Sequence, residues 1–194
     1  ILQKYMDWID ANFKCENGLY KVPHQCSTMF NSPREGTCYP IDFNAALAIN
    51  ALYMSALGDI LNDKDLIFQY KRMYFSLKTR INSKMWNPET GFYYDLDESE
   101  NQLSVKTIAG FWPLLAEIPN EDKADMLIAH LSNPETFGTE HPFPTLSMDD
   151  PHFSQDGNGF CGSVYPAFNF MVLKGLERYQ HWDFTRESAI RHLY

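Results

Sequence analysis

The chain has 194 residues, which is enough for one domain with a sizeable core. Hydrophobic residues make up 44% and charged residues 21%, a globular composition that argues against a disordered or fibrous chain. The net charge is -9 and no cationic cluster is present that would bind phosphate backbones, so we expect no nucleic-acid partner. No apolar run approaches the roughly 18 to 20 residues that span a bilayer, so we also expect no membrane partner.

The chain opens with residues 2–13, which have the pattern of an outer, amphipathic helix. Residues 42–59 carry no charge between their terminal aspartates and are apolar on every face, which predicts a helix buried all round. Gly58 lies where a C-terminal cap is expected, and Asn62 or Asp63 can cap a following amphipathic helix. These segments predict a hairpin of one inner and one outer helix.

The same pattern recurs twice. Residues 107–118 are apolar, and Asn120 after them can cap an outer helix whose inward side includes Met126. Residues 163–179 and the segment from about 183 to the chain end form the third pair. Two segments lie between the pairs: residues 85–96 predict a short β-ribbon, and residues 133–162, rich in Pro and Gly, predict a long functional loop.

Repeated hairpins of this kind predict an all-α fold, an α/α toroid with a small β-ribbon and one long loop. An α-solenoid is the weaker alternative, because no repeat of fixed length is apparent. About three and a half hairpins do not close a ring, and the inner helices of an open arc expose apolar flanks. We therefore expect residues 1–194 to be part of a single domain that is incomplete at both ends, with the rest of the ring as its partner.

The sequence gives no indication of a metal or cofactor. The four cysteines are Cys15, Cys26, Cys38 and Cys161. They form no C-x-x-C pair, so we expect thiols, with a disulfide among the first three as the alternative. Asp95 and Asp97 beside the ribbon lack the spaced ligand set of a calcium site, and we interpret them as solvated turn acids. The start at Ile1, without Met, leaves the compartment open between cytoplasmic, periplasmic and secreted.

Four segments follow one another in an order and spacing typical of one enzyme family. They are residues 41–45 (IDFNA), 86–95 (WNPETGFYYD), 105–115 (VKTIAGFWPLL) and 160–169 (FCGSVYPAFN). Together they resemble the trehalase and processing α-glucosidase type of glycoside hydrolase, with its mannosyl-oligosaccharide glucosidase and mannosylglycerate hydrolase-like members. The resemblance implies part of an (α/α)6 barrel, similar to its C-terminal half, that acts on α-linked glucosides or related oligosaccharides.

The resemblance also implies an inverting mechanism, in which one carboxylic acid protonates the leaving oxygen and one carboxylate activates water. The family's acid is an Asp in a loop that here reads STMFNSPR, residues 27–34, and Phe30 occupies the Asp position. Because phenylalanine transfers no proton, Glu35 and Asp42 are the nearest acid candidates. Their alternatives are a surface carboxylate and a helix cap. The family's base lies beyond Tyr194, so we expect this chain alone to be inactive.

The same resemblance implies residues that contact the sugar. Arg34 matches an Arg of the acid loop, with a loop salt bridge as the alternative. Phe160 matches an aromatic residue that lines the sugar site, with core packing as the alternative. Glu140 and His141 lie in the long loop near the cavity mouth, with a solvated pair as the alternative. Phe30 is included with them because of its place in the acid loop.

Three functions are consistent with the sequence. The first is part of a glycoside hydrolase with a glucoside or oligosaccharide substrate. The second is a non-catalytic relative that binds carbohydrate, which Phe30 favours. The third is a helical scaffold module, and the long polar loop with its interleaved aromatic residues argues mildly against it.

Overall fold

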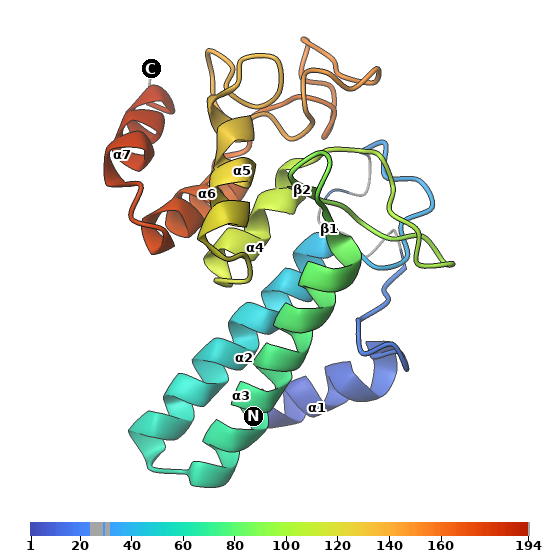
Figure 1. The fold of residues 1–194 in the computed structure, drawn as a ribbon, viewed down its shortest axis with the longest axis vertical. Coiled ribbons are helices and arrows are strands. Elements are labelled where there is room, and N and C mark those ends of the chain that lie inside the picture. The colour runs from blue at the N-terminus through green and yellow to red at the C-terminus, as the bar shows by residue number, and fades with distance from the viewer. Residues whose placement is uncertain (24–28, 30–31, 194) are drawn as a thin grey trace.

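Inner and outer helices alternate along the chain in the computed structural model, which describes residues 1–23, 29 and 32–193 (Figure 1). The helices are α1 (Leu2–Phe13), α2 (Ile41–Leu61), α3 (Lys64–Arg80), α4 (Trp112–Leu115), α5 (Glu121–Ser132), α6 (Pro166–Arg178) and α7 (Trp182–Arg191). A π-helical turn, η2 (Ile81–Met85), extends α3, and a 3-10 turn, η3 (Ile108–Phe111), precedes α4. The strands β1 (Trp86–Asn87) and β2 (Phe92–Tyr93) form the predicted antiparallel ribbon. The predicted order of elements is confirmed.

The α2–α3 hairpin is closed by a two-residue turn. Asn62 ends α2 in the left-handed conformation at φ 59°, and the Asp63 carboxylate caps α3 by accepting a hydrogen bond from Leu66 N at 3.0 Å. Gly58 is not the cap, because it lies inside α2. A Cβ at Gly58 would lie 2.8 Å from Ile67 Cγ1, so the glycine is required for α3 to approach α2 closely.

The inner helix α2 is only partly buried. Its side toward α3, η3 and α4 carries the core residues, but Tyr53 is 53% exposed and Leu57 is also exposed, so the prediction of burial on every face was wrong. The 21-residue helix also reaches the length and hydropathy of a membrane span, with half of its most apolar stretch buried inside the chain. The expectation that no segment approaches that length was therefore wrong as well. A core helix meets the same criteria, and the packing of α2 against α3 is that of a core helix.

The second inner segment is much shorter than predicted. Instead of a helix over residues 107–118, the chain forms η3 and the four residues of α4. Gly110 lies against β2, where a Cβ would overlap the ring of Phe92, and Pro113 opens α4 without an N–H to donate. The following cap is as predicted, since the Asn120 side chain accepts from Lys123 N at 3.2 Å. Met126 of α5 does not point inward, because it is 44% exposed.

Long and short connections lie at opposite ends of the molecule (Figure 1). The long connections lead from an outer to an inner helix, and the short ones lead from an inner to an outer helix. Backbone hydrogen bonds join the long connections to one another: Tyr39 pairs with Leu96, and Ile108 N donates to Thr145 O at 3.0 Å. One end of the structure is therefore a continuous surface of loops, called the loop face below.

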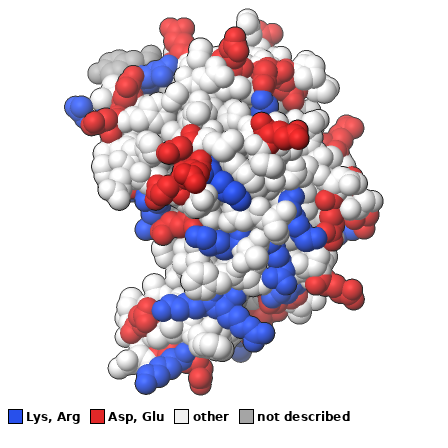
Figure 2. All heavy atoms as spheres, in the orientation of Figure 1, with Lys and Arg blue, Asp and Glu red and all other residues white. Residues whose placement is uncertain are grey.

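The polar side of α3 carries several cationic residues. Lys and Arg side chains gather over the lower half of the view in Figure 2, where α3 lies. The cationic residues of α3 itself are Lys64, Lys71, Arg72, Lys78 and Arg80. The opposite side of α3 carries Tyr70, Tyr74 and Leu77 into the core. This division between a wet and an apolar side orients the outer helix against α2.

Asp63→Ala tests the cap of α3. Removing the acceptor of Leu66 N is expected to lower the free energy of unfolding by about 1 kcal/mol in urea denaturation. The matched control is Asp65→Ala, which removes the same charge from the first turn of α3 without removing a cap and costs a few tenths of a kcal/mol at most. Equal losses in the two variants would contradict the cap.

Candidate functional site

The candidate site lies on the loop face. The first long connection carries Arg34 and Glu35 and leads into Asp42 at the start of α2. The third carries the other predicted contacts, from Glu140 to Phe160. Phe30, in the predicted acid loop, lies outside the described residues.

Arg34 is held between two carboxylates at the base of this face. Its Nε and Nη2 donate to the two oxygens of Asp95 at 2.6 and 2.8 Å, a bidentate pair. Its Nη1 and Nη2 also donate to Asp42 at 3.3 and 3.2 Å. Asp95 accepts further hydrogen bonds from Thr37 Oγ1 at 3.1 Å and Ile41 N at 2.8 Å. Arg34, Asp42 and Asp95 are called the buried ion cluster below.

The buried ion cluster is almost fully removed from water, with exposures of 1% for Arg34, 2% for Asp42 and 6% for Asp95. Burial alone would lower the pKa of the Arg34 guanidinium, but the charges of Asp42 and Asp95 outweigh it and raise the pKa above its ordinary value. One cation faces two anions, so backbone donors are needed to satisfy the remaining carboxylate oxygens. Phe43 N donates to Asp42 at 2.9 Å, in addition to Ile41 N on Asp95.

These contacts show which partners Arg34, Asp42 and Asp95 have in the fold. Arg34 of the first long connection forms a salt bridge, and this salt bridge is buried. Asp42 sits in the first turn of α2 as its partner. Asp95 is not a solvated turn acid, and that interpretation was wrong. No local signal in the sequence pairs it with a residue 61 positions earlier, although Asp95 ends the motif that carries the family resemblance.

Glu35 differs from its neighbours in the buried ion cluster. It is exposed at a turn directly after Arg34, next to the segment that contains Phe30. The structure therefore separates the two acid candidates: Asp42 is enclosed, and Glu35 faces solvent on the loop face.

Three aromatic rings gather at the start of α6. The Phe160 ring lies 4.8 Å from the Tyr165 ring and 5.7 Å from the Phe168 ring, centroid to centroid. Phe160 is half-buried and packs against the core, and Tyr165 remains 38% exposed. The trio thus presents a partly exposed aromatic surface to which the apolar face of a sugar ring can stack.

The long loop folds around a cavity of about 660 Å³. Glu140 and His141 both line it, together with Phe153, Asp156 and Ser163. The main chain of this segment is anchored from α7, because Arg191 donates to the carbonyls of Thr139 and Glu140. The structure therefore brings Glu140 and His141 to one cavity, and Phe160 precedes cavity-lining Gly162 by two residues.

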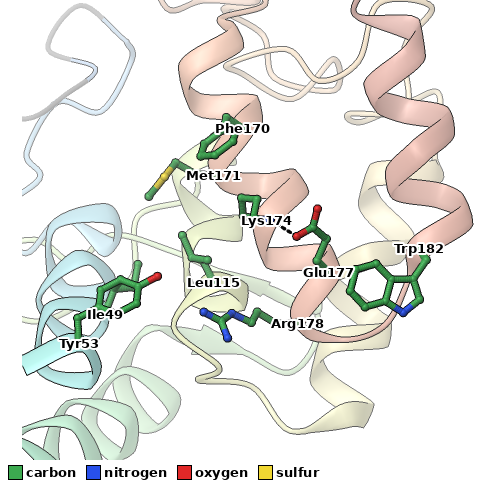
Figure 3. Close-up of a pocket in the computed structure, with 9 residues that line it drawn as sticks. All are labelled: Ile49, Tyr53, Leu115, Phe170, Met171, Lys174, Glu177, Arg178 and Trp182. Atoms are coloured by element: carbon green, nitrogen blue, oxygen red, sulfur yellow. Dashed lines mark hydrogen bonds and ion pairs between the residues drawn. The ribbon is translucent and has the colours of Figure 1, made fainter. Parts of the chain in front are cut away.

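A second cavity, of about 540 Å³, opens on the inner side of the hairpins between α2, α4 and α6 (Figure 3). Tyr53, Phe170 and Trp182 contribute exposed aromatic rings to it. Lys174 and Glu177 form an ion pair along its α6 side. Of the predicted sugar contacts that the structure describes, none lines this cavity.

The described residues contain no group of three or more His, Cys, Asp or Glu side chains that could hold a metal ion. Cys15, Cys38 and Cys161 are thiols rather than disulfides in this part of the chain. Cys26 lies outside the described residues.

Asp95→Asn tests the buried ion cluster. Removing one partner of a buried ion pair is expected to cost roughly 3 to 5 kcal/mol of unfolding free energy, measured by urea denaturation. Glu98→Gln is the control, since it removes a carboxylate from an exposed pair with Lys21 and should leave stability nearly unchanged. A similar small effect in both variants would show that Asp95 does not stabilise the fold.

Comparison with known proteins places the chain in a family. Residues 1–193 match the model of the mannosylglycerate hydrolase MGH1-like glycoside hydrolase domain. A protein of Borreliella burgdorferi named only as uncharacterized is 53% identical over all 194 residues, which are 41% of its length. The cytosolic neutral trehalase of Kluyveromyces lactis is 31% identical over 90% of this chain and 24% of its own. The chain thus spans less than half the length of these relatives.

The fold agrees with that match. The GH63 mannosylglycerate hydrolase of Thermus thermophilus, solved in complex with Tris, superposes on 80% of this chain and 36% of its own at a TM-score of 0.72 and 23% identity. This likeness confirms the predicted six-hairpin glycosidase fold class. The chain belongs to the family of mannosylglycerate hydrolase MGH1-like glycoside hydrolase domains.

Proposed function

We propose that this chain supplies part of the sugar-binding face of a glycoside hydrolase that acts on α-linked glucosides or related oligosaccharides. The observation that carries the proposal is the loop cavity with Glu140 and His141, close in the chain to the aromatic trio around Phe160. Carboxylate and imidazole groups exchange hydrogen bonds with sugar hydroxyls, and aromatic rings stack on the apolar side of the sugar. Relatives named trehalase and mannosylglycerate hydrolase support this substrate class.

For the reaction we propose inversion, with a protonated carboxyl group on one side of the glycosidic bond and a carboxylate that activates water on the other. Such pairs are roughly 6.5 to 9.5 Å apart. Glu35 is the preferred acid because it is exposed on the loop face. Asp42 is less suited, since its carboxylate accepts hydrogen bonds from Arg34 and Phe43 N, whereas a general acid has to offer a proton. The base would come from outside these residues.

The rest of the ring is the proposed protein partner. The inner cavity of Figure 3 presents Tyr53, Phe170 and Trp182 to solvent. Several exposed aromatic side chains that gather around one cavity favour an interface with another part of the protein. The greater length of the relatives supports further hairpins as the occupant.

A non-catalytic carbohydrate-binding protein is the second candidate. It is favoured by Phe30 at the position of the family's acid and by the engagement of Asp42 with Arg34. A binding protein would keep the loop cavity and the aromatic trio without turnover.

Turnover separates the two candidates. The complete protein is incubated with trehalose and with mannosylglycerate, and the anomer released first is followed by NMR. Glu35→Gln is expected to lower the rate by about 10² to 10⁴. Exposed Glu89 on the ribbon turn gives the control Glu89→Gln, which should keep the rate. An undiminished rate in Glu35→Gln would remove Glu35 as the acid, and binding without turnover would favour the second candidate.

Phe160→Ala tests the sugar-binding surface under either candidate. Loss of the ring is expected to weaken saccharide binding by about tenfold, measured by calorimetry, because the stacking surface is removed. The control Phe75→Ala removes an exposed ring from α3 and should not change affinity. Unchanged affinity in Phe160→Ala would assign Phe160 to core packing.

The inner cavity predicts how the 194-residue chain behaves when it is expressed alone. We expect it to self-associate or aggregate, seen by size-exclusion chromatography with light scattering, because Tyr53, Phe170 and Trp182 are more than half exposed. Phe170→Ser with Trp182→Ser should reduce the association, whereas Phe68→Ser on exposed α3 should not. A monomeric chain that melts cooperatively would argue against a missing partner.

A further inference from the structure

Two inner helices have a buried Asn at the same position in their first turn. Asn44 is the fourth residue of α2 and Asn169 is the fourth residue of α6, and both side chains are fully buried. In each case a Tyr-Pro dipeptide precedes the Asn by a few residues, at Tyr39 and at Tyr165. Two equivalent positions with the same polar residue at no exposure call for a common role, because a buried amide is retained only where its hydrogen bonds are satisfied.

Asn44 binds the first long connection. Its Oδ1 accepts from Tyr20 N at 2.8 Å, and its Nδ2 donates to Tyr20 O at 3.0 Å. The same Nδ2 donates to Pro40 O at 2.9 Å, just ahead of α2. One side chain thus fixes both backbone groups of Tyr20 against the first turn of α2, at the base of the connection that carries Arg34 and Glu35.

Asn169 binds the third long connection in the same way. Its Oδ1 accepts from Phe143 N at 3.2 Å, and its Nδ2 donates to Phe143 O at 3.1 Å. Phe143 is fully buried and lies two residues after His141, which lines the loop cavity. The amide therefore fixes the segment that brings Glu140 and His141 over the start of α6.

The second inner segment lacks such an Asn and is fixed by main-chain contacts instead. Ile108 N donates to Thr145 O at 3.0 Å, and Thr107 pairs with Leu146. The segment fixed by Asn169 is therefore also the one on which the start of η3 depends. A shift of Phe143 would therefore disturb both α6, through Asn169, and η3, through Thr145.

We propose that Asn44 and Asn169 are the positioning residues of the candidate sugar site, each holding one loop of the site over the first turn of its own inner helix. That the site binds sugar rests on the proposed function, whereas the holding of the two loops rests on the hydrogen bonds of the two amides. Neither residue contacts the reacting groups. Each acts through the main chain of a loop that does.

Asn169→Asp is the sharpest variant, because it keeps the size and one acceptor while it removes the donor to Phe143 O. In the complete protein, amide hydrogen exchange in peptides that cover residues 139–146 is expected to speed up by about tenfold or more. Calorimetric affinity for trehalose and for mannosylglycerate is expected to fall by about tenfold. Asn44→Asp should speed up exchange in residues 15–23 and leave residues 139–146 unchanged.

Asn82→Asp is the matched control. Asn82 also bridges separate segments. It donates to Ile118 O at 2.8 Å and accepts from the Tyr93 hydroxyl at 2.7 Å and from Lys123 Nζ at 3.0 Å, but these partners lie in neither of the loops held by Asn44 and Asn169. It should lower the melting temperature without loss of saccharide affinity. If Asn169→Asp does not fold, Asn169→Ser, which introduces no charge, replaces it in the same measurements.

The outcomes separate the two proposals. Faster exchange confined to the loop of the altered Asn, with weaker saccharide binding, supports the positioning role. Unchanged exchange, or an equal loss of affinity in Asn82→Asp, overturns it. If the unaltered protein binds neither saccharide, the proposed function fails, while the exchange measurement still decides whether the two amides hold their loops.

Discussion

The arrangement of the loop face depends on the ion pairs that the buried guanidinium of Arg34 forms with Asp95 and Asp42. Its bidentate pair with Asp95 and its second pair with Asp42 join three parts of the chain: the connection after α1, the start of α2 and the end of the β-ribbon. A buried charge is costly unless every partner is in place, so these parts cannot move independently. Asp95 also accepts from Ile41 N, which ties the ribbon to the first turn of α2. The position of the first inner helix and that of the loops above it are therefore fixed together.

Local patterns in the sequence were sufficient for much of the fold. The helical periods, the caps at Asp63 and Asn120 and the aromatic ribbon all depend on residues close in sequence, and they were confirmed. The failures have tertiary causes. Gly58 looked like a cap, but it serves the approach of α3, and Pro113 and the ribbon packed on η3 shorten the second inner helix. Exposure of Tyr53 follows from which neighbours are present, which no local pattern reports.

The candidate site was predictable only in part, for the same reason. The sequence places Glu140 and His141 in one loop, and the structure adds that this loop lines an open cavity. The role of Asp95 could not be found, because its partner is 61 positions away and the sequence offers no spacing rule for such a pair. Asn169 stood in the family motif without an assigned role, and only the hydrogen bonds to Phe143 identify one.

The contrast between long and short connections has a consequence for how such a domain can diversify. Loop length adds little to the entropic cost of closing a loop, so residues can be inserted into the outer-to-inner connections without disturbing helix packing. The tight turns at the other end, such as Asn62 and Asp63 between α2 and α3, allow no such freedom. Natural insertions and substitutions should therefore accumulate on the loop face, and laboratory libraries are best placed there. New specificity can arise on this surface while the packing of the helices stays unchanged.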